Sequence, residues 1–371
     1  MKFNRYTLGE LVSIKYGKNQ KNVLSESGTY PIYGTGGLMG YATEPLYTKP
    51  SVLIGRKGTI DKVKFVDHPF WTVDTLFYTI VNEDIVIPKY LYYRMSMMDL
   101  SAYNEGTTIP SLRTETLNRL EFDIPSIEEQ QKILSYLEPI DDKIALNREI
   151  NNNLEQQAMA YYRELFVLGA KTTWRIGTIS DLGSVVGGST PSKAKEEYYT
   201  DSGIAWITPK DLSNDKSKYI YHGENDITEL GLKNSSAIIM PKGTVLFSSR
   251  APIGYIAIAG CSVTTNQGFK SVIPKPEIGT AFIYYFLKDN LPIIEGMASG
   301  STFKEVSGST MKNVPAIIPD KETLAIFNEF CAPIFEQQRV LESETRSLIE
   351  MRDGLLAKLM SGEIDVSTLE I

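Results

Sequence analysis

Short polar segments recur at matched places in the two halves of the sequence. Residues 55–59, GRKGT, correspond to residues 248–252, SSRAP, and residues 105–108, EGTT, correspond to residues 299–302, SGST. Arginine and lysine suit guanine acceptors or phosphates, and asparagine and glutamine suit the edge of adenine. Because the framework repeats while these side chains differ, the segments predict two contact surfaces for DNA with different targets.

The predicted DNA contacts come from these segments and from polar residues near them. Lys210 and the amides of Asn266 and Gln267 add hydrogen-bonding groups in the second half. Many loop serines, threonines and asparagines instead cap turns, and this alternative applies to each such residue singly. The predicted DNA-contacting residues are Arg56, Lys57, Thr107, Thr108, Lys210, Arg250, Asn266, Gln267, Ser301 and Thr302.

No residue pattern typical of an enzyme accompanies these segments. The sequence has no Gly-x4-Gly-Lys-Ser/Thr loop, and His222-Gly223-Glu224 is not followed by the Pro-Cys-x-x-Cys of zinc deaminases. Two histidines and two cysteines are too few for a typical zinc site. We therefore expect a non-catalytic chain that binds no metal and no cofactor of its own.

An internal repeat organises the whole sequence. Residues 52–60 align with residues 245–253 at an offset of 193, and four further blocks follow in order at offsets of 192 to 194. Residues 7–11 align with residues 178–182 at an offset of 171, so the second copy has about 22 additional residues between these blocks. Matched blocks in one order, at a nearly constant offset, indicate a duplication.

Each copy begins with a globule and ends with a helical segment. Short β-branched runs bounded by glycine and proline predict strands, and residues 89–100 and 280–291 predict short helices. The predicted fold class is α+β, a tandem duplication of a mixed α/β domain followed by a long helix. The predicted segments are a first globule at 1–125, a central helical region at 126–169, a second globule at 170–319 and a C-terminal helical region at 320–371.

The helical segments have a heptad pattern. Ser126 and Glu129 have the spacing of a capping box, and Asp320 occupies the cap position in the second copy. Apolar positions then alternate by four and three residues, so we expect the two helices to pair as an antiparallel coiled coil that holds the globules apart. The alternative is that each stripe packs only on its own globule. Predicted seam and partner-binding residues include Ile140, Ile144, Leu154, Leu165, Ile334, Leu341, Leu348 and Leu355.

Two prolines occupy the same position in the two helical segments. Pro139 and Pro333 are 194 residues apart, and a proline inside a helix removes a hydrogen bond and clashes with the preceding turn. We therefore expect both helical regions to break or kink there. Gly362 is the expected end of the last helix.

The net charge of −7 is unevenly distributed. It is +1 for residues 1–125, −4 for residues 126–169, +2 for residues 170–319 and −6 for residues 320–371. Acidic helices are expected to face protein, whereas near-neutral globules can still bind DNA where their cations gather on one face. No apolar stretch has the length of a signal core or a membrane span, so we expect a soluble, cytoplasmic chain.

Several longer motifs together resemble those of one known family. The chain resembles the specificity subunits of type I restriction–modification enzymes. This resemblance covers nearly the whole chain. One departure from the family pattern is TLA at residues 323–325, where the first copy has EQQ at the equivalent residues 129–131. The motifs are YPIYGTGG at 30–37, LIGRKGT at 53–59, FWTVDT at 70–75, WITPKDL at 206–212, TNQGF at 265–269 and LLAKLMSGEID at 355–365.

The resemblance implies a non-catalytic subunit for DNA methylation and defence. Each globule would be a target recognition domain for one half of a bipartite double-stranded DNA target, and the helices would set the gap and dock two methylation subunits. S-adenosylmethionine, ATP and Mg²⁺ would be bound by the methylation and restriction subunits. One alternative is a non-catalytic scaffold whose duplicated domains bind protein or glycan. Another is a stand-alone nuclease or methyltransferase.

Overall fold

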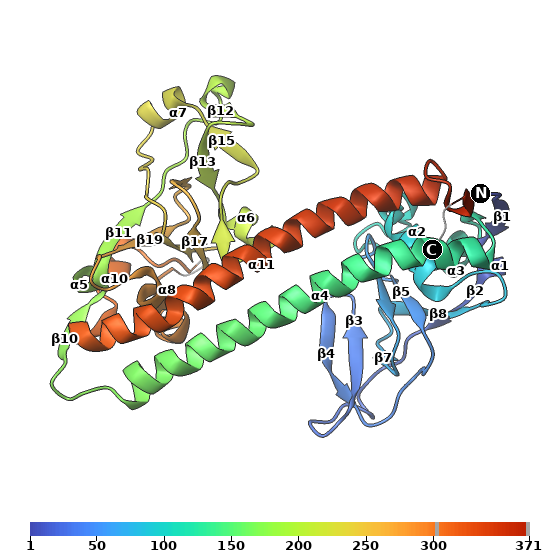
Figure 1. Ribbon diagram of the computed structural model, residues 1–371, viewed down its shortest axis with the longest axis horizontal. Coiled ribbons are helices and arrows are strands. Elements are labelled where there is room, and N and C mark those ends of the chain that lie inside the picture. The colour runs from blue at the N-terminus through green and yellow to red at the C-terminus, as the bar shows by residue number, and fades with distance from the viewer. Residues whose placement is uncertain (301–303, 369–371) are drawn as a thin grey trace. The chain divides into compact units, whose positions relative to one another are not determined.

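The computed structural model describes residues 1–300 and 304–368, and the chain divides into two compact units (Figure 1). The first unit comprises Met1–Ile144 and Ser347–Ile371, and the second comprises Ala145–Arg346. The long helices α4 (Ile127–Arg163) and α11 (Lys321–Ser361) each contribute to both units. Each unit therefore consists of one globule and part of each long helix.

The first globule is built on a four-stranded antiparallel sheet with the order β2-β8-β5-β6. Its central strand β5 is buried along its whole length, as expected for an apolar run between turns. The strands of this sheet are β2 (Val12–Tyr16), β8 (Leu76–Val81), β5 (Ser51–Gly55) and β6 (Val63–Val66). A second sheet contains β4 (Gly37–Ala42), β3 (Tyr30–Gly34) and β7 (Trp71–Thr72), and a ribbon pairs β1 (Asn4–Thr7) with β9 (Glu121–Ile124). The short helices are α1 (Leu8–Leu11), α2 (Pro88–Ser96), η1 (Leu100–Tyr103) and α3 (Thr114–Asn118).

The second globule repeats this plan with a larger sheet of order β11-β19-β16-β17-β14. Its strands are β11 (Gly183–Gly187), β19 (Lys270–Pro274), β16 (Val245–Ser249), β17 (Ile253–Ala259) and β14 (Tyr219–Ile220). A second sheet contains β12 (Tyr199–Thr200), β15 (Asn225–Ile227), β13 (Ile204–Ile207) and β18 (Thr264–Thr265), and a ribbon pairs β10 (Arg175–Thr178) with β20 (Pro315–Ile318). Its helical turns are α5 (Ile179–Leu182), η3 (Glu196–Tyr198), α6 (Pro209–Asn214), α7 (Glu229–Lys233), α8 (Thr280–Asp289), α9 (Leu291–Gly296) and α10 (Gly308–Lys312).

The predicted duplication is confirmed by the matched elements. The order β2-β8-β5-β6 recurs as β11-β19-β16-β17, and the parallel pair β3–β7 recurs as β13–β18. A capping box opens α1 at Thr7 and Glu10, and another opens α5 at Thr178 and Asp181. The strand β14 has no counterpart in the four-stranded sheet, because the additional residues of the second copy lie between β13 and β16.

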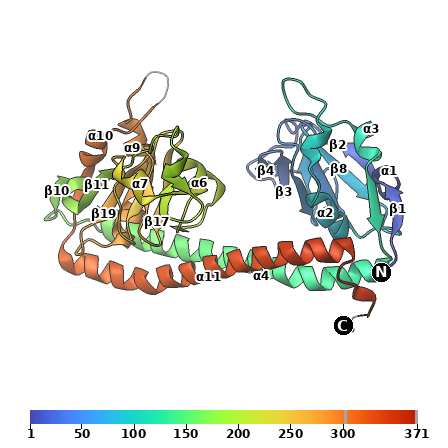
Figure 2. The same ribbon diagram turned by 90° about the horizontal axis from the view of Figure 1, so that it is seen from above.

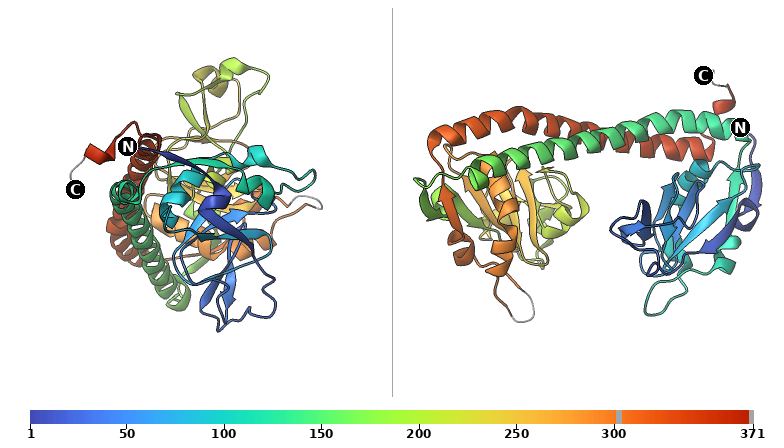
Figure 3. Two further views of the ribbon diagram at one scale, coloured as in Figure 1. Left: turned by 90° about the vertical axis from the view of Figure 1, so that its right-hand side faces the viewer. Right: turned by 90° about the horizontal axis from the view of Figure 1, so that it is seen from below.

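The predicted antiparallel helix pairing is confirmed within each unit (Figures 2 and 3). In the second unit the rings of Tyr161 and Phe330 lie 4.4 Å apart, and Asn147 Nδ2 donates to Glu344 at 2.8 Å. Each of the eight predicted seam residues is buried or partly buried. Glu129 accepts the Ser126 N–H at 3.0 Å and Asp320 accepts the Thr323 N–H at 2.8 Å, so both predicted caps are present.

The helices also pack on the globules, so the two packing alternatives occur together. In the first unit Ile133 and Leu137 share a core with Leu356, Leu359 and the globule. In the second unit Tyr162, Phe166 and Phe327 lie in the core of the globule, where Tyr162 also contacts Phe282 at a ring distance of 5.8 Å. Each apolar stripe therefore joins a globule to both helices within its unit.

The expected breaks at the two prolines are wrong. Helix α4 continues through Pro139 and α11 continues through Pro333. The predicted end of the last helix is confirmed, because α11 ends at Ser361 and Gly362 follows with φ +79°. Both prolines lie on exposed faces, opposite the packed stripes. The packing of the stripes therefore outweighs the local cost of about 3 kcal/mol for a proline inside a helix.

Replacing Pro139 by alanine is expected to stabilise the protein by about 2 kcal/mol. The substitution restores a backbone N–H to the helix interior, and the gain is reduced by the greater freedom of alanine in the unfolded chain. Thermal unfolding of the variant measures the change. Pro292→Ala is the matched control, because this exposed proline lies in the first turn of α9, where no helical hydrogen bond is lost. Equal effects of the two substitutions would contradict the explanation.

Candidate nucleic-acid interface

Two loops of the first globule lie side by side and bring four predicted residues together. The Gly58 N–H donates to Pro110 O at 2.9 Å, and the Leu112 N–H donates to Arg56 O at 3.0 Å. Gly58 has φ +89°, a conformation that glycine adopts without strain. We call residues 56–58 and 105–111 the first loop pair, and it carries Arg56, Lys57, Thr107 and Thr108.

The side chains of the first loop pair differ in their exposure and in the contacts that they already make. Lys57, Thr107 and Thr108 are exposed. Arg56 is partly buried, donates to Asp74 O at 2.8 Å and lies 5.1 Å from the centre of the Tyr16 ring. Because these contacts already fix the guanidinium, less side-chain entropy is lost when it binds a ligand.

The second globule has an equivalent arrangement. The Val306 N–H donates to Ser249 O at 2.9 Å, as Leu112 donates to Arg56 in the first globule, and Ser299 and Glu305 exchange backbone hydrogen bonds of 3.1 and 2.9 Å. We call residues 249–252, 299–300 and 304–306 the second loop pair. The predicted contacts Ser301 and Thr302 lie outside the described residues.

A carboxylate between two cations occupies the second loop pair. Glu305 lies 3.6 Å from Arg250 Nη1 and 3.5 Å from Lys270 Nζ. Arg250 and Glu305 also line a cavity of about 630 Å³. In the free chain Glu305 partly neutralises the two cations, and a phosphate or guanine edge would compete with it for their N–H groups. Lys270 was not among the predicted DNA contacts, although it lies in residues 267–270, which align with residues 74–77 at an offset of 193.

The remaining predicted contacts have other partners. Asn266 Oδ1 accepts the Gly268 N–H at 2.9 Å, which is the turn-capping role considered as an alternative. Gln267 is exposed and accepts a hydrogen bond from the Thr190 hydroxyl, while its backbone oxygen accepts one from Lys270 at 3.3 Å. The structure therefore brings Gln267 toward the second loop pair through Lys270.

Lys210 lies on α6 rather than on the second loop pair. Its Nζ donates to Glu224 at 2.6 Å, and this hydrogen bond raises the pKa of the lysine. Lys210 is next to Pro209, which packs closely against Gly268 in the Asn266–Gly268 turn. A Cβ atom added to Gly268 would lie 3.0 Å from Pro209 Cγ. A role of Lys210 in DNA binding stays a prediction.

The histidines have local structural partners. His68 lies 3.0 Å from the Tyr33 hydroxyl and 3.2 Å from Asp67, and His222 lies 3.2 Å from Gly223 O. Among residues 1–300 and 304–368, no group of three His, Cys, Asp or Glu side chains is placed to hold a metal ion. No helix in that part of the chain is long and apolar enough to span a membrane.

Comparison with known proteins gives one consistent family. The family model described as the type I restriction modification DNA specificity domain matches residues 2–156 and 171–341. The MjaIX specificity subunit of Methanocaldococcus jannaschii is 43% identical over 178 residues, which cover 46% of this chain and 41% of that protein. The HindI specificity subunit of Haemophilus influenzae is 27% identical over 384 residues, which cover 81% of this chain and 83% of that protein.

A solved structure shares the fold. The S subunit of a type I restriction–modification system from M. genitalium has a TM-score of 0.59 and 18% identity, and the match covers 97% of this chain and 96% of that chain. The two family matches coincide with the two copies of the repeat and together cover most of the sequence. The chain therefore belongs to the type I restriction–modification DNA specificity family.

Proposed function

We propose that this chain is the specificity subunit of a type I restriction–modification complex and that each globule reads one half of a bipartite DNA target. The two loop pairs carry this proposal. They have equivalent backbone hydrogen bonds, through Arg56 in the first globule and Ser249 in the second, but different polar side chains. A repeated backbone frame with different side chains suits two readers with different half-sites.

The chain supplies recognition, and its partners supply chemistry. Two methylation subunits bind the acidic helical regions and hold S-adenosylmethionine, and restriction subunits add the ATP- and Mg²⁺-dependent steps. The globules have a combined net charge of +3, which gives a weak electrostatic attraction to DNA. The chain alone therefore binds DNA weakly, and binding becomes tight when the methylation subunits close around the duplex.

Sequencing of adenine methylation in cells with and without this chain tests the proposal. The methylation subunits are present in both samples, and bipartite sites methylated only in the presence of the chain support the proposal. Purified complex should also give a sequence-dependent gel shift that weakens as the salt concentration rises.

Two results would contradict the proposal. No chain-dependent methylation, together with no gel shift at low salt, would favour a scaffold that binds protein or glycan. DNA cleavage or methylation by the purified chain without its partners would instead show a catalytic function.

A further inference from the structure

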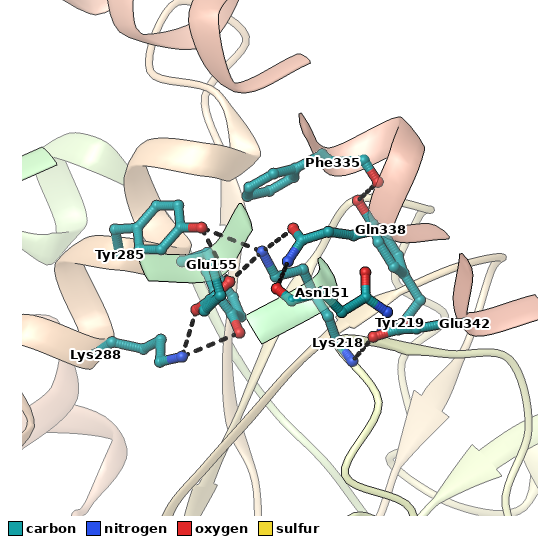
Figure 4. Close-up of polar contacts among 10 residues, drawn as sticks. Asn151, Glu155, Lys218, Tyr219, Tyr285, Lys288, Phe335, Gln338 and Glu342 are labelled. Atoms are coloured by element: carbon teal, nitrogen blue, oxygen red, sulfur yellow. Dashed lines mark hydrogen bonds and ion pairs between the residues drawn. The ribbon is translucent and has the colours of Figure 1, made fainter. Parts of the chain in front are cut away.

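A buried polar cluster joins the second globule to both long helices (Figure 4). Lys218, which immediately precedes β14, lies with its Nζ 2.6 Å from Glu155 Oε2 on α4 and 2.6 Å from Gln338 Oε1 on α11. The same Nζ lies 3.2 Å from the Tyr285 hydroxyl on α8, and the Lys218 side chain is only 5% exposed. One ammonium group therefore connects the sheet edge of the globule to two helices that are far apart in sequence.

Further hydrogen bonds hold the same part of the second globule against the two long helices. Glu342 on α11 accepts the Lys218 N–H at 2.6 Å and the Tyr219 N–H at 3.1 Å. Gln338 Nε2 donates to Asn151 O on α4 at 3.1 Å. Gln338 therefore contacts α4 and the globule at once, and a shift of either one along α11 would break its hydrogen bonds.

The electrostatics favour an ionised Glu155 inside this cluster. Burial by itself would raise the pKa of Glu155. The positive charges of Lys218 and Lys288, with their hydrogen bonds, together have the larger effect and lower that pKa to about 2. Burial lowers the pKa of Lys218, and Glu155 opposes this change. The side chain of Lys218 also lies 4.0 Å from the centre of the Phe335 ring, a favourable contact for a cation.

The internal repeat shows that the helix pair does not need polar residues at these places. At an offset of 194, Gln338 corresponds to Ile144, which is buried, and Glu155 corresponds to Ile349. Lys218 lies among the residues that the first globule lacks, beside the unmatched strand β14. The polar cluster is therefore specific to the second unit.

The polar seam has a cost that apolar side chains would avoid. Within the described residues, the buried oxygens Asn147 Oδ1 and Asn151 Oδ1 have no hydrogen-bond partner. Buried charged groups contribute little net stability compared with well-packed apolar residues, but they favour one arrangement because their contacts are directional. In helix pairs, a buried polar residue has this effect on register.

We propose that Lys218, Glu155 and Gln338 fix the orientation of the second globule on the helices and so restrict the gap between half-sites that the complex methylates. The inference rests on the proposed function of the chain. The three residues are positioning residues, because they touch no DNA and act through the placement of the second loop pair. Their loss is expected to relax the gap preference rather than the preference for bases within each half-site.

Methylation of duplexes with altered gaps tests this role. The reconstituted complex is given the target found by methylation sequencing, with its gap unchanged or changed by one base pair in either direction. For Lys218→Met we expect the preference for the unchanged gap to fall about tenfold, the scale set by loss of hydrogen bonds to a charged group. Gln338→Met keeps the Lys218–Glu155 pair and should lower the preference in the same direction.

The control and the outcomes separate this inference from the proposed function. Leu324→Met changes a buried apolar residue of α11 in the same unit, outside the polar cluster, and should leave the gap preference unchanged. A preference unchanged in Lys218→Met, or lowered equally in Leu324→Met, overturns the inference alone. If Lys218→Met fails to fold, Gln338→Met decides by the same comparison. A wild-type complex without any gap preference would overturn both the inference and the proposed function.

Discussion

Alanine in place of Arg250 is expected to remove recognition of one half-site, and alanine in place of Arg56 is expected to remove recognition of the other. Each arginine belongs to one loop pair, and one arginine–base contact contributes about 1–3 kcal/mol of discrimination. Methylation of the cognate target should therefore fall by roughly 5- to 150-fold in each variant. Substitution of the base that the arginine contacts should then have little further effect.

The loop pairs are expected to survive these substitutions. The second loop pair is closed by backbone hydrogen bonds between Ser299 and Glu305 and between Val306 and Ser249, which need no arginine side chain. Glu305 also keeps Lys270 as an ionic partner when Arg250 is removed. A loss of methylation in Arg250→Ala would therefore reflect lost contacts rather than a lost loop conformation.

Methylation of duplexes with base changes in one half-site measures both variants, and each variant is a control for the other. Lys233→Ala is a further control, since it removes one exposed positive charge on α7, outside the second loop pair. Equal loss of discrimination at both half-sites in a single variant would contradict the assignment. It would point to a defect in folding or assembly instead.

The architecture could be predicted from sequence because local patterns determine most of it. The four–three spacing that includes Ile144 and Leu341 places a stripe on one helix face, and such a stripe must pack against something apolar. The caps at Ser126 and Asp320 depend on side chains within three residues, so their hydrogen bonds could also be predicted.

The continuity of the helices could not be predicted from local rules. Pro139 and Pro333 are unfavourable for their own turns, but their cost is outweighed by packing of other residues on the opposite face. That balance depends on contacts such as those of Phe327 and Tyr162, which lie far apart in sequence. Only the tertiary structure shows that the packing energy is larger than the cost of the proline.

The candidate site was predictable in its loops but not in its details. The segments of Arg56 and Thr107 were both predicted to contact DNA, and backbone hydrogen bonds join them. The pairing of Glu305 with Arg250 and Lys270, and the position of Lys218 between two helices, have no local sequence signal. Such contacts join residues from distant segments, and a lone lysine in a sequence is typical of an exposed side chain.

Lengthening both long helices by one heptad is expected to lengthen the gap between half-sites by about three base pairs. Seven residues add ~10 Å of helix, and one base pair of DNA rises ~3.4 Å. The insertions would be made between Ile144 and Ala145 and between Arg346 and Ser347, at the boundaries of the two units, and would keep the heptad pattern. Hydrogen bonds and packing inside each unit would then stay as they are.

Methylation sequencing in cells that express the lengthened chain measures the new gap. Three base pairs also rotate one half-site by about 100° around the duplex, so total methylation should fall because the DNA must twist or bend. A seven-residue insertion between Thr172 and Thr173 is the matched control, since it adds the same length of chain before β10 without lengthening either helix. Unchanged half-sites with a longer gap in the helix variant alone would show that the helices measure the gap, because the reading loops are identical in both chains. An unchanged gap would instead mean that DNA or partner subunits determine the distance.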